Sequence, residues 1–239
     1  MLGLPDMIHA CLFDLDGVLT DTAAVHKVAW AGTFDPVLQA HGQPEFSQAD
    51  YDEYVDGKPR LDGVRDFLAS RGIDLPEGTD DDEPGNDTIH AVAERKNRDV
   101  LQRIKTDGVR VFPGSLAYLK AATEAGLRRV VVSSSANTAD VLAVTGLDAY
   151  VEDRVDGVTI KSTGMAGKPA PDSFLAGAQR VGVDPGRAAV FEDATAGVEA
   201  GRRGNFGFVV GVNRLDDAHG EALHAHGADV VVRDLSELL

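Results

Sequence analysis

The sequence predicts an α/β protein whose core is a doubly wound parallel sheet, with an inserted α-helical cap domain. Short, uniformly apolar runs recur along the second half of the chain, as expected for strands that are covered on both faces. Helical patterns separate these runs, and such alternation is typical of a parallel sheet. The stretch from residue 23 to about 108 has helical patterns but lacks comparable β-branched runs, which indicates the insertion.

The apolar run Ala10–Phe13 predicts the first strand, and we expect it to join the same sheet as the later ones. The carboxyl ends of parallel strands meet at one edge of a sheet, where α/β proteins bind their ligands. Polar residues that follow the strands are therefore the candidates for chemistry. The other predicted strands are residues 129–132, 188–191, 208–210 and 229–232.

Helical patterns divide the chain into two parts. In the sheet-forming part, apolar spacing predicts helices over residues 115–123, 138–144 and 174–181, and glycines follow each of them. In the insertion it predicts helices over residues 25–38, 64–71 and 88–105, with an acidic, solvated loop at residues 76–85. We therefore expect a core domain of residues 1–21 and 109–239 and a helical cap domain of residues 22–108.

The composition of the chain limits the classes of function and the kinds of partner that we expect. The chain has 239 residues, 43% of them hydrophobic, but no apolar run near the ~20 residues that a membrane span needs. The first residues lack a secretion signal, and the single cysteine, Cys11, lies inside the first strand, so we expect a cytoplasmic protein. A net charge of −16 argues against nucleic acid and anionic membranes as partners. An enzyme of phosphate esters would need local cations to reverse this field.

Two carboxylates leave the end of the first strand together. Asp14 and Asp16 are separated by one residue, and Gly17 follows. Two acids so close repel each other, and a bound cation is the simplest way to keep both ionised. A carboxylate beside a divalent metal at a strand end is equipped to attack phosphorus. The alternative is an acidic loop without chemistry.

Residues 13–22, Phe-Asp-Leu-Asp-Gly-Val-Leu-Thr-Asp-Thr, resemble the first motif of the haloacid dehalogenase superfamily. Most members of that superfamily transfer phosphoryl groups through an aspartyl-phosphate on a Rossmann-like core. The resemblance implies that Asp14 is the nucleophile and a ligand of Mg²⁺. It also implies that the backbone carbonyl of Asp16 binds the metal, which leaves the Asp16 carboxyl to act as general acid and base.

Ser133 matches the second motif of this superfamily, at the end of a predicted strand. A hydroxyl followed by the amides of a helix start suits a phosphate oxygen. Ser135 and Asn137 match positions that help to hold a phosphate in the closest relatives. The alternative for this serine-rich segment is a helix N-cap, which Ser and Asn also favour.

Lys168, in Lys-Pro-x-Pro-Asp before an amphipathic helix, resembles the third motif and would offset the charge of Asp14 and of a transferring phosphoryl group. A solvated lysine is the alternative. Glu192 and Asp193 end another strand and would complete the cation site with Asp14 and Asp16, although such a pair can also cap a helix. Whether Glu192 binds the metal directly or through water is left open.

Thr22-Ala23-x-x-His26-x-x-x-Trp30, at the start of the insertion, and Arg95-Lys96-Asn97, later in it, resemble the cap of β-phosphoglucomutases. Gly57-Lys58-Pro59-Arg60 is similar to that family's Gly-x-x-Arg, which holds the distal phosphate of the substrate, as an arginine fork suits a phosphate that stays in place. A mutase needs this second phosphate site, and a simple monophosphatase does not. The cap residues implicated in substrate binding are Thr22, His26, Trp30, Gly57, Arg60, Lys96 and Asn97.

Several cap residues also have simpler interpretations. Trp30 fits the core of the cap, Lys96 a solvated helix charge and His26 an ordinary helical residue. The family often has Lys just before Gly-x-x-Arg, whereas this chain has Asp56, and Lys58 is a candidate to supply the missing charge. The histidines near the C-terminus lack a ligand set, and we expect them to be solvated: His219, His224 and His226.

The resemblance implies a Mg²⁺-dependent enzyme that converts β-D-glucose 1-phosphate to glucose 6-phosphate through glucose 1,6-bisphosphate. It further implies a pathway link to a disaccharide phosphorylase, which releases β-glucose 1-phosphate. The main alternative is a phosphatase of small sugar phosphates on the same fold. A binding or regulatory protein that has lost catalysis is a third hypothesis, although all the core groups are present.

Overall fold

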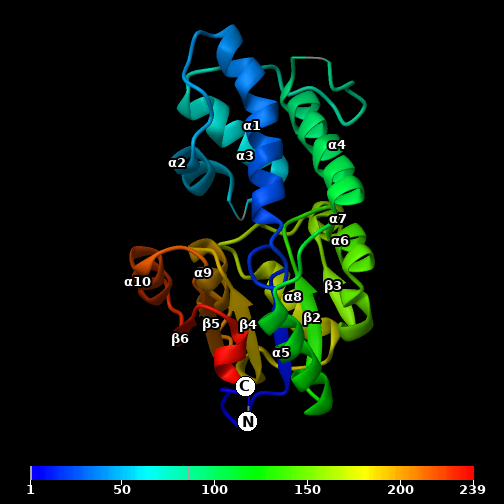
Figure 1. Cartoon of the computed structure of the whole chain (residues 1–239), viewed down its shortest axis with the longest axis vertical. Helices are drawn as coiled ribbons and strands as arrows, with labels where there is room; N and C mark the ends of the chain where they lie inside the picture. Colours follow the sequence, from blue (N-terminus) through cyan, green and yellow to red (C-terminus); the bar gives the residue numbers. More distant parts are fainter. Residues whose placement is uncertain (1, 57, 86) are drawn as a thin grey trace. The chain divides into compact units, whose positions relative to one another are not determined.

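In the computed structural model, which describes residues 2–56, 58–85 and 87–239, six parallel strands form one sheet in the order β3-β2-β1-β4-β5-β6 (Figure 1). The strand order changes direction between β1 and β4. From this point β2 and β3 follow β1 toward one edge of the sheet, and β5 and β6 follow β4 toward the other. The predicted doubly wound fold is confirmed. The strands are β1 (Ala10–Phe13), β2 (Arg128–Val132), β3 (Asp153–Val155), β4 (Ala188–Glu192), β5 (Phe208–Val212) and β6 (Val230–Val232).

The central strand β1 is buried on both faces. Leu12 packs in a cluster with Phe174, while on the opposite face Phe13 stacks on Phe191 at 4.5 Å between ring centroids and meets Tyr118 edge-on at 6.2 Å. Successive side chains of a strand point to opposite faces, so a uniformly apolar run requires a cover on each side. This explains why the short apolar runs predicted the strands.

Helices of the core unit flank the sheet (Figure 1). The α5 helix begins with Pro113 in its first turn, a position where proline costs no hydrogen bond, and α6 ends at Gly146 in the left-handed conformation. The helices are α5 (Pro113–Glu124), α6 (Thr138–Thr145), α7 (Gly157–Thr163), α8 (Asp172–Arg180), α9 (Thr195–Arg203) and α10 (Asp217–Ala225), with 3₁₀ turns η2 (Leu147–Tyr150), η3 (Pro185–Arg187) and η4 (Leu235–Leu238).

The chain divides into two compact units. One comprises Met1–Asp21 and Val109–Leu239 and contains the sheet, and the other comprises Thr22–Gly108. The second unit is helical and has an aromatic core, in which Phe34 lies 4.2 Å from Phe67 between ring centroids. Its elements are α1 (Ala23–Ala40), α2 (Gln48–Asp50), the π-helical turn η1 (Tyr51–Val55), α3 (Arg60–Ser70) and α4 (Ile89–Asp107).

The acidic loop before α4 is irregular, as its composition predicts, but it is locally organised. The Asp82 carboxylate accepts hydrogen bonds from the Thr88 hydroxyl at 2.6 Å and from the Thr79 amide at 3.2 Å. Thr88 in turn accepts a hydrogen bond from the Ala91 amide at 3.1 Å and so caps α4. The loop is therefore joined to the helix start through Asp82 and the partly buried hydroxyl of Thr88.

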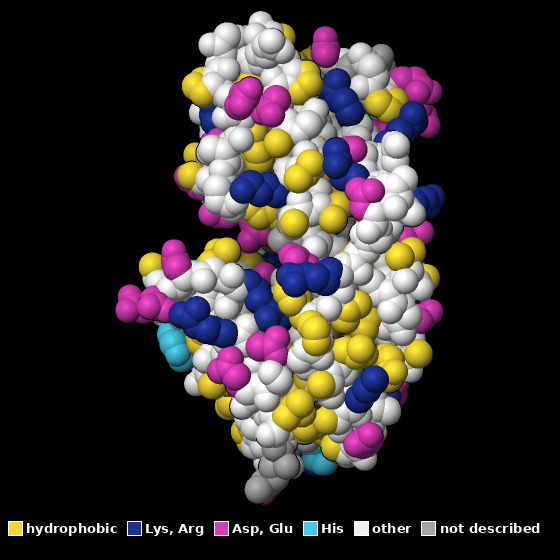
Figure 2. Space-filling model, in the orientation of Figure 1, with side chains coloured by type: hydrophobic (Ala, Val, Ile, Leu, Met, Phe, Trp, Pro, Cys, Tyr) yellow, Lys and Arg dark blue, Asp and Glu magenta, His cyan; other side chains and the backbone are white. Residues whose placement is uncertain are grey.

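Charge is distributed over the surface in both signs. Acidic and basic side chains are interspersed on the face shown in Figure 2. Among the described residues, no helix combines the length and the apolar character that a membrane crossing requires. Because charges of both signs are interspersed, the electrostatic field at any one site depends mainly on the charged groups nearest to it.

Candidate active site

The candidate nucleophile lies directly beyond β1. The Asp14 amide donates to the carbonyl of Phe191 at 2.9 Å, which extends the strand ladder by one residue, and the Asp14 side chain is buried. The chain then turns into a closed loop in which the Leu19 and Thr20 amides donate to the Leu15 carbonyl at 3.0 and 2.9 Å. Asp14 is therefore held by the sheet, and the residues after it by local hydrogen bonds.

Lys168 joins two buried carboxylates. Its ammonium lies 2.6 Å from Oδ1 of Asp14 and 2.7 Å from Oε2 of Glu192, and it also donates to the Val132 carbonyl at 3.3 Å. The Phe174 ring lies below it, 4.8 Å from the ammonium to the centroid. Burial by itself would lower the pKa of Lys168, but the charges of Asp14 and Glu192 outweigh it and raise that pKa. The solvated-lysine alternative is therefore wrong.

The acidic side chains at this edge outnumber the ammonium. Asp14, Glu192 and Asp193 each place a carboxylate oxygen within 4.8 Å of the others. Burial, the charge of Glu192 and that of Asp16 raise the pKa of Asp14 well above its usual range, and Lys168 opposes them only in part. This excess of negative charge on oxygen ligands fits a divalent cation such as Mg²⁺, which prefers oxygen ligands.

Ser133 connects the second strand end to Asp16. Its hydroxyl donates to the Asp16 carboxylate at 3.3 Å and accepts from the Ser135 amide at 3.0 Å. The Ser135 hydroxyl accepts from the Asn137 amide at 3.2 Å, and Asn137 precedes α6. The Asn137 side chain makes no capping bond to α6, so the simple N-cap interpretation fails for this residue. The Ser133 hydroxyl thus contacts the candidate acid-base group directly, and the Ser135 amide holds that hydroxyl in place.

The helical unit holds a second polar cluster. The Lys96 ammonium lies 2.7 Å from Nδ1 of His26 and 4.7 Å from the centroid of the Trp30 ring, and only 4% of the Lys96 surface is exposed. The hydrogen bond requires Nδ1 to be the acceptor, so His26 carries its proton on Nε2. Lys96 is therefore not a solvated helix charge. Trp30 also belongs to the core of this unit, where it stacks on Phe34 at 4.9 Å.

Buried polar atoms without protein partners lie in the same unit. Among the described residues, Nε of Arg60, Nε and Nη2 of Arg95 and Oδ1 of Asn97 have no hydrogen-bond partner. Buried polar groups are normally satisfied, so such a group of donors and acceptors indicates a polar ligand. Burial lowers the pKa of Arg60, while the charges of Glu94 and Asp80 oppose it.

The remaining predicted cap residues differ in what the structure says of them. Thr22 stands at the N-cap position of α1 with its side chain buried. Gly57 lies outside the described residues. Lys58 donates to the Asp66 carboxylate at 2.6 Å, so its charge is already engaged within the helical unit.

The chain is similar in sequence to proteins of known families. Residues 8–205 match the family described as haloacid dehalogenase-like hydrolase. The chain is also 55% identical to a β-phosphoglucomutase of Mycobacterium bovis over 247 positions, which cover 100% of this chain and 94% of that protein. The chain belongs to the haloacid dehalogenase-like hydrolases, among their β-phosphoglucomutase-like members. The predicted family and the prediction of an enzyme of this type are confirmed.

Two further proteins extend the comparison. The crystal structure of a β-phosphoglucomutase from Clostridium difficile has a TM-score of 0.79 and 25% identity, and the match covers 97% of this chain and 93% of that one. An uncharacterized glycosyl hydrolase of Mycobacterium tuberculosis is 34% identical over 95% of this chain but only 17% of that protein. Enzymes of this family need a divalent metal, which agrees with the acidic cluster of the core unit.

Sequence reasoning missed one residue at the candidate metal site. Nε2 of His219, on α10, lies 2.8 Å from the backbone carbonyl of Asp193, so the expectation that all three C-terminal histidines are solvated is wrong for His219. His224 and His226 are exposed, as expected. No sequence pattern marks His219, because its partner is 26 residues away and belongs to another element.

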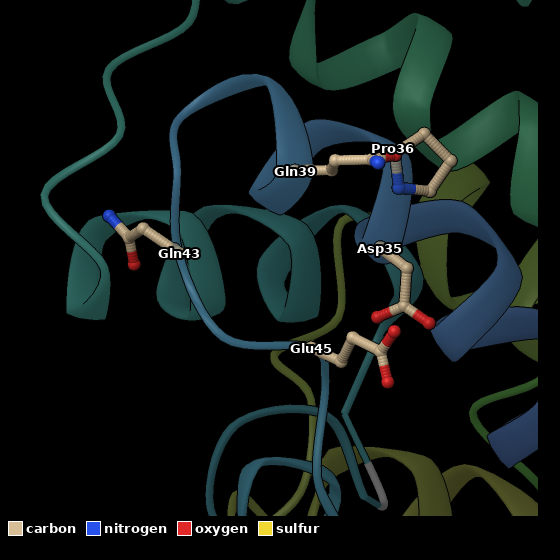
Figure 3. A pocket seen from close by; sticks show the side chains of 5 residues that line it. All are labelled: Asp35, Pro36, Gln39, Gln43 and Glu45. Carbon is tan, nitrogen blue, oxygen red and sulfur yellow. The ribbon is translucent and has the colours of Figure 1, made fainter.

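A pocket on the helical unit is a different feature. It is lined by Asp35, Pro36, Gln39, Gln43 and Glu45, and Figure 3 shows the two carboxylates facing each other beside it. None of the predicted site residues lines it. Two acids would repel a phosphate ester, so this pocket is not the candidate substrate site.

Proposed function

We propose that the chain is a Mg²⁺-dependent β-phosphoglucomutase that converts β-D-glucose 1-phosphate to glucose 6-phosphate through glucose 1,6-bisphosphate. The observation that supports the proposal is a set of cationic side chains in the helical unit: Lys96, which is buried beside His26, and Arg60 and Arg95, whose buried N–H groups have no hydrogen-bond partner among the described residues. A mutase must hold one phosphate while the other reacts. The full-length identity of 55% to a β-phosphoglucomutase supports the same conclusion.

Asp14 carries the phosphoryl group between two positions of the sugar. In the first half-reaction the C6 hydroxyl of β-glucose 1-phosphate attacks the phosphorus of phospho-Asp14, the aspartyl oxygen leaves, and Asp16 takes the hydroxyl proton. In the second, Asp14 attacks the C1 phosphoryl group of the bisphosphate, and Asp16 returns its proton to the departing sugar oxygen. Glucose 6-phosphate is released and Asp14 is phosphorylated again.

Three groups assist the transfer. The Lys168 ammonium, 2.6 Å from Asp14, offsets the charge that builds up on the phosphoryl oxygens. The Ser133 hydroxyl has one proton, which it donates to Asp16 here and would donate to a phosphoryl oxygen in its place when substrate is bound. Asp14, Glu192, Asp193 and the Asp16 carbonyl would hold Mg²⁺, which supplies positive charge for the phosphoryl oxygens when it is bound.

Residues of the helical unit would bind the phosphate that does not react. The Arg60 guanidinium suits a phosphate because its N–H groups form a planar fork. Lys96 and His26 form a hydrogen-bonded pair, and the positive charge of the ammonium would help to bind the sugar phosphate. Thr22, Trp30, Gly57 and Asn97, and in the core Ser135 and Asn137, complete the proposed binding set.

A phosphatase of small sugar phosphates is the second candidate. Asp56 replaces the lysine that β-phosphoglucomutases often have here, and Lys58, the candidate substitute, is held by Asp66. The two functions share the chemistry at Asp14 and differ in whether water reaches the phosphoenzyme. The weakened positive charge before Arg60 is the observation that favours this candidate.

We also propose a supply reaction. A mutase for the β-anomer needs an enzyme that releases β-glucose 1-phosphate, and a disaccharide phosphorylase does so by cleaving a glycosidic bond with phosphate. The glycosyl hydrolase relative supports the link. Its match to 95% of this chain occupies only 17% of that protein, so a segment similar to this chain is joined there to a much longer protein that is named for action on glycosidic bonds.

One assay separates the candidates. The protein is given β-glucose 1-phosphate, Mg²⁺ and a trace of glucose 1,6-bisphosphate, and glucose 6-phosphate and free phosphate are measured in parallel. The mutase predicts glucose 6-phosphate in large excess, and mostly free phosphate would favour the phosphatase. Mass spectrometry under turnover should find a phosphoryl adduct on Asp14 that the Asp14→Asn variant lacks, and absence of the adduct would contradict both candidates.

A further inference from the structure

Arg214 connects the loop that follows the nucleophile to the segment that follows β6. It lies two residues beyond β5, at the carboxyl edge of the sheet. Its Nε donates to the Gly17 carbonyl at 2.9 Å, and its Nη2 donates to the Val18 carbonyl at 3.3 Å. One guanidinium therefore holds two successive peptide groups of a loop that is 197 residues away in the sequence.

The guanidinium is itself fixed on several sides. It stacks on the Phe112 ring at 3.8 Å to the centroid, and Nη1 donates to the Arg233 carbonyl at 2.7 Å and to the Asp234 carboxylate at 3.2 Å. Ser115, which is fully buried, supports the same loop by donating to the Val18 carbonyl at 2.6 Å. Planar stacking and a fork of donors limit the positions that the Arg214 head can take.

Gly17 is the point at which this support meets the candidate metal site. Its φ of +82° is a left-handed conformation, and a Cβ there would lie 1.6 Å from Oδ2 of Asp193, so the Asp193 carboxylate rests directly against the Gly17 backbone. The Gly17 amide donates to the Thr20 carbonyl at 2.7 Å. Because N–H and C=O point in opposite directions across a trans peptide, this bond also directs the Asp16 carbonyl away from Thr20.

We propose that Arg214 is a positioning residue that holds the Asp16–Gly17–Val18 turn, and that it thereby sets both the affinity of the site for Mg²⁺ and the placement of the Asp16 carboxyl. The hydrogen bonds of Arg214 to this loop reach the backbone carbonyls of Gly17 and Val18, so the proposal assigns it no direct contact with substrate. It acts through Gly17, whose backbone separates the arginine from Asp193. The inference rests on the proposed metal site, since a shifted turn would displace the Asp16 carbonyl from the ligand set.

A simple structural clasp is the competing interpretation. Arg202 provides a matched control, because its Nε and Nη2 donate to the Gly227 carbonyl at 3.0 and 2.6 Å and its Nη2 to Asp229 at 2.7 Å. Arg202 lies on α9, near the amino ends of β5 and β6, whereas Arg214 lies at the carboxyl edge of the sheet. Loss of either arginine removes carbonyl and carboxylate contacts, but only Arg214 adjoins the site.

The test measures Mg²⁺ binding by titration calorimetry and kcat and KM for the sugar phosphate, with thermal unfolding as a control for folding. We expect Arg214→Met to weaken Mg²⁺ binding at least about tenfold, as loss of a supporting partner does in other metal sites, and to lower kcat more than it raises KM. Arg202→Met should change neither. Arg214→Lys should recover part of the loss, because an ammonium still donates to the Gly17 carbonyl.

Equal Mg²⁺ affinity in Arg214→Met, Arg202→Met and the unaltered protein would overturn the proposal. If Arg214→Met does not fold, the same comparison uses Arg214→Lys and Ser115→Ala, and unaltered Mg²⁺ affinity in both overturns it equally. The unaltered protein separates the two claims. If the unaltered protein binds no Mg²⁺ and forms no adduct on Asp14, the proposed function fails. If it binds Mg²⁺ and forms the adduct, and the variants bind Mg²⁺ equally well, only the role of Arg214 fails.

Discussion

The ammonium of Lys168 lies 2.6 Å from Oδ1 of Asp14, with both side chains buried. The same ammonium contacts Glu192 at 2.7 Å, so one cation is shared between two carboxylates from two neighbouring strands. Asp14 therefore has a permanent cationic neighbour, whatever else binds at the site. Loss of that neighbour should affect the transfer of a charged group more than the binding of the sugar.

Replacement of Lys168 by methionine should lower kcat by about 10²–10³, because a fixed charge that stabilises the transferring group is lost. The KM for the sugar phosphate should change much less. Lys161→Met is the matched control, since Lys161 is an exposed residue on α7 and should leave kcat unaltered. A kcat of Lys168→Met close to that of the control would exclude Lys168 from the transfer step.

Gly17→Ala should abolish most of the activity and weaken Mg²⁺ binding. The new Cβ would lie 1.6 Å from the Asp193 carboxylate, and the φ of +82° is unfavourable for alanine. Gly146→Ala separates these effects, because Gly146 also has a positive φ of +69° but nothing lies within 4 Å of a Cβ. It should cost about 1 kcal/mol of stability and leave Mg²⁺ affinity unaltered, as measured by thermal unfolding and calorimetry.

The sequence predicts those parts of the fold and site that depend on neighbours along the chain. The apolar run of β1 followed by Asp14 and Asp16 is such a case, because a buried strand and its polar end leave a local pattern. The edge strand β3 was not predicted, since its three residues, Asp153–Val155, have two polar side chains and resemble a loop. The π-helical turn Tyr51–Val55 likewise has no distinctive sequence pattern.

Contacts between distant segments were harder to predict than residue types. Lys96 was singled out, but its hydrogen bond to His26 spans 70 residues and becomes visible only when α1 and α4 pack together. The contacts of Arg214 with Gly17 and of His219 with Asp193 were missed altogether. An arginine or histidine in a polar segment looks the same whether it is solvated or holds a backbone carbonyl, so only the tertiary fold distinguishes the two.

Arg60→Ala should raise the KM for glucose 1,6-bisphosphate about tenfold or more if Arg60 binds the distal phosphate, since a charge-assisted bidentate contact is lost. Arg65→Ala on the same helix is the control, because the Arg65 side chain is 41% exposed and pairs with Asp62 at 2.8 Å and with Glu77. Steady-state kinetics with the bisphosphate as the varied substrate measures both. An equal KM in the two variants would place the phosphate anchor elsewhere.

Asp50 should make the stability of the helical unit depend on pH. Its carboxylate accepts hydrogen bonds from Arg71 at 2.6 Å and from the Ser47 amide and hydroxyl at 2.9 and 2.7 Å. Burial by itself would raise the pKa of Asp50, but the hydrogen bonds from Arg71 and Ser47 outweigh it and lower that pKa. A carboxyl group with a lowered folded-state pKa stabilises the protein above its unfolded pKa of about 4, and this contribution is lost as the pH falls through the folded value.

Asp50→Asn keeps the shape of the side chain and removes its charge, so it should cost about 1–3 kcal/mol near neutral pH and progressively less as the pH falls to about 3. Trp30, the chain's single tryptophan, lies in the core of this unit, and its fluorescence reports unfolding by urea at each pH. Asp62→Asn is the control, because Asp62 is exposed and its pair with Arg65 should contribute little at any pH. A stability deficit of Asp50→Asn that stays constant from neutral to acidic pH would mean that packing, and not the charge of Asp50, stabilises this corner of the helical unit.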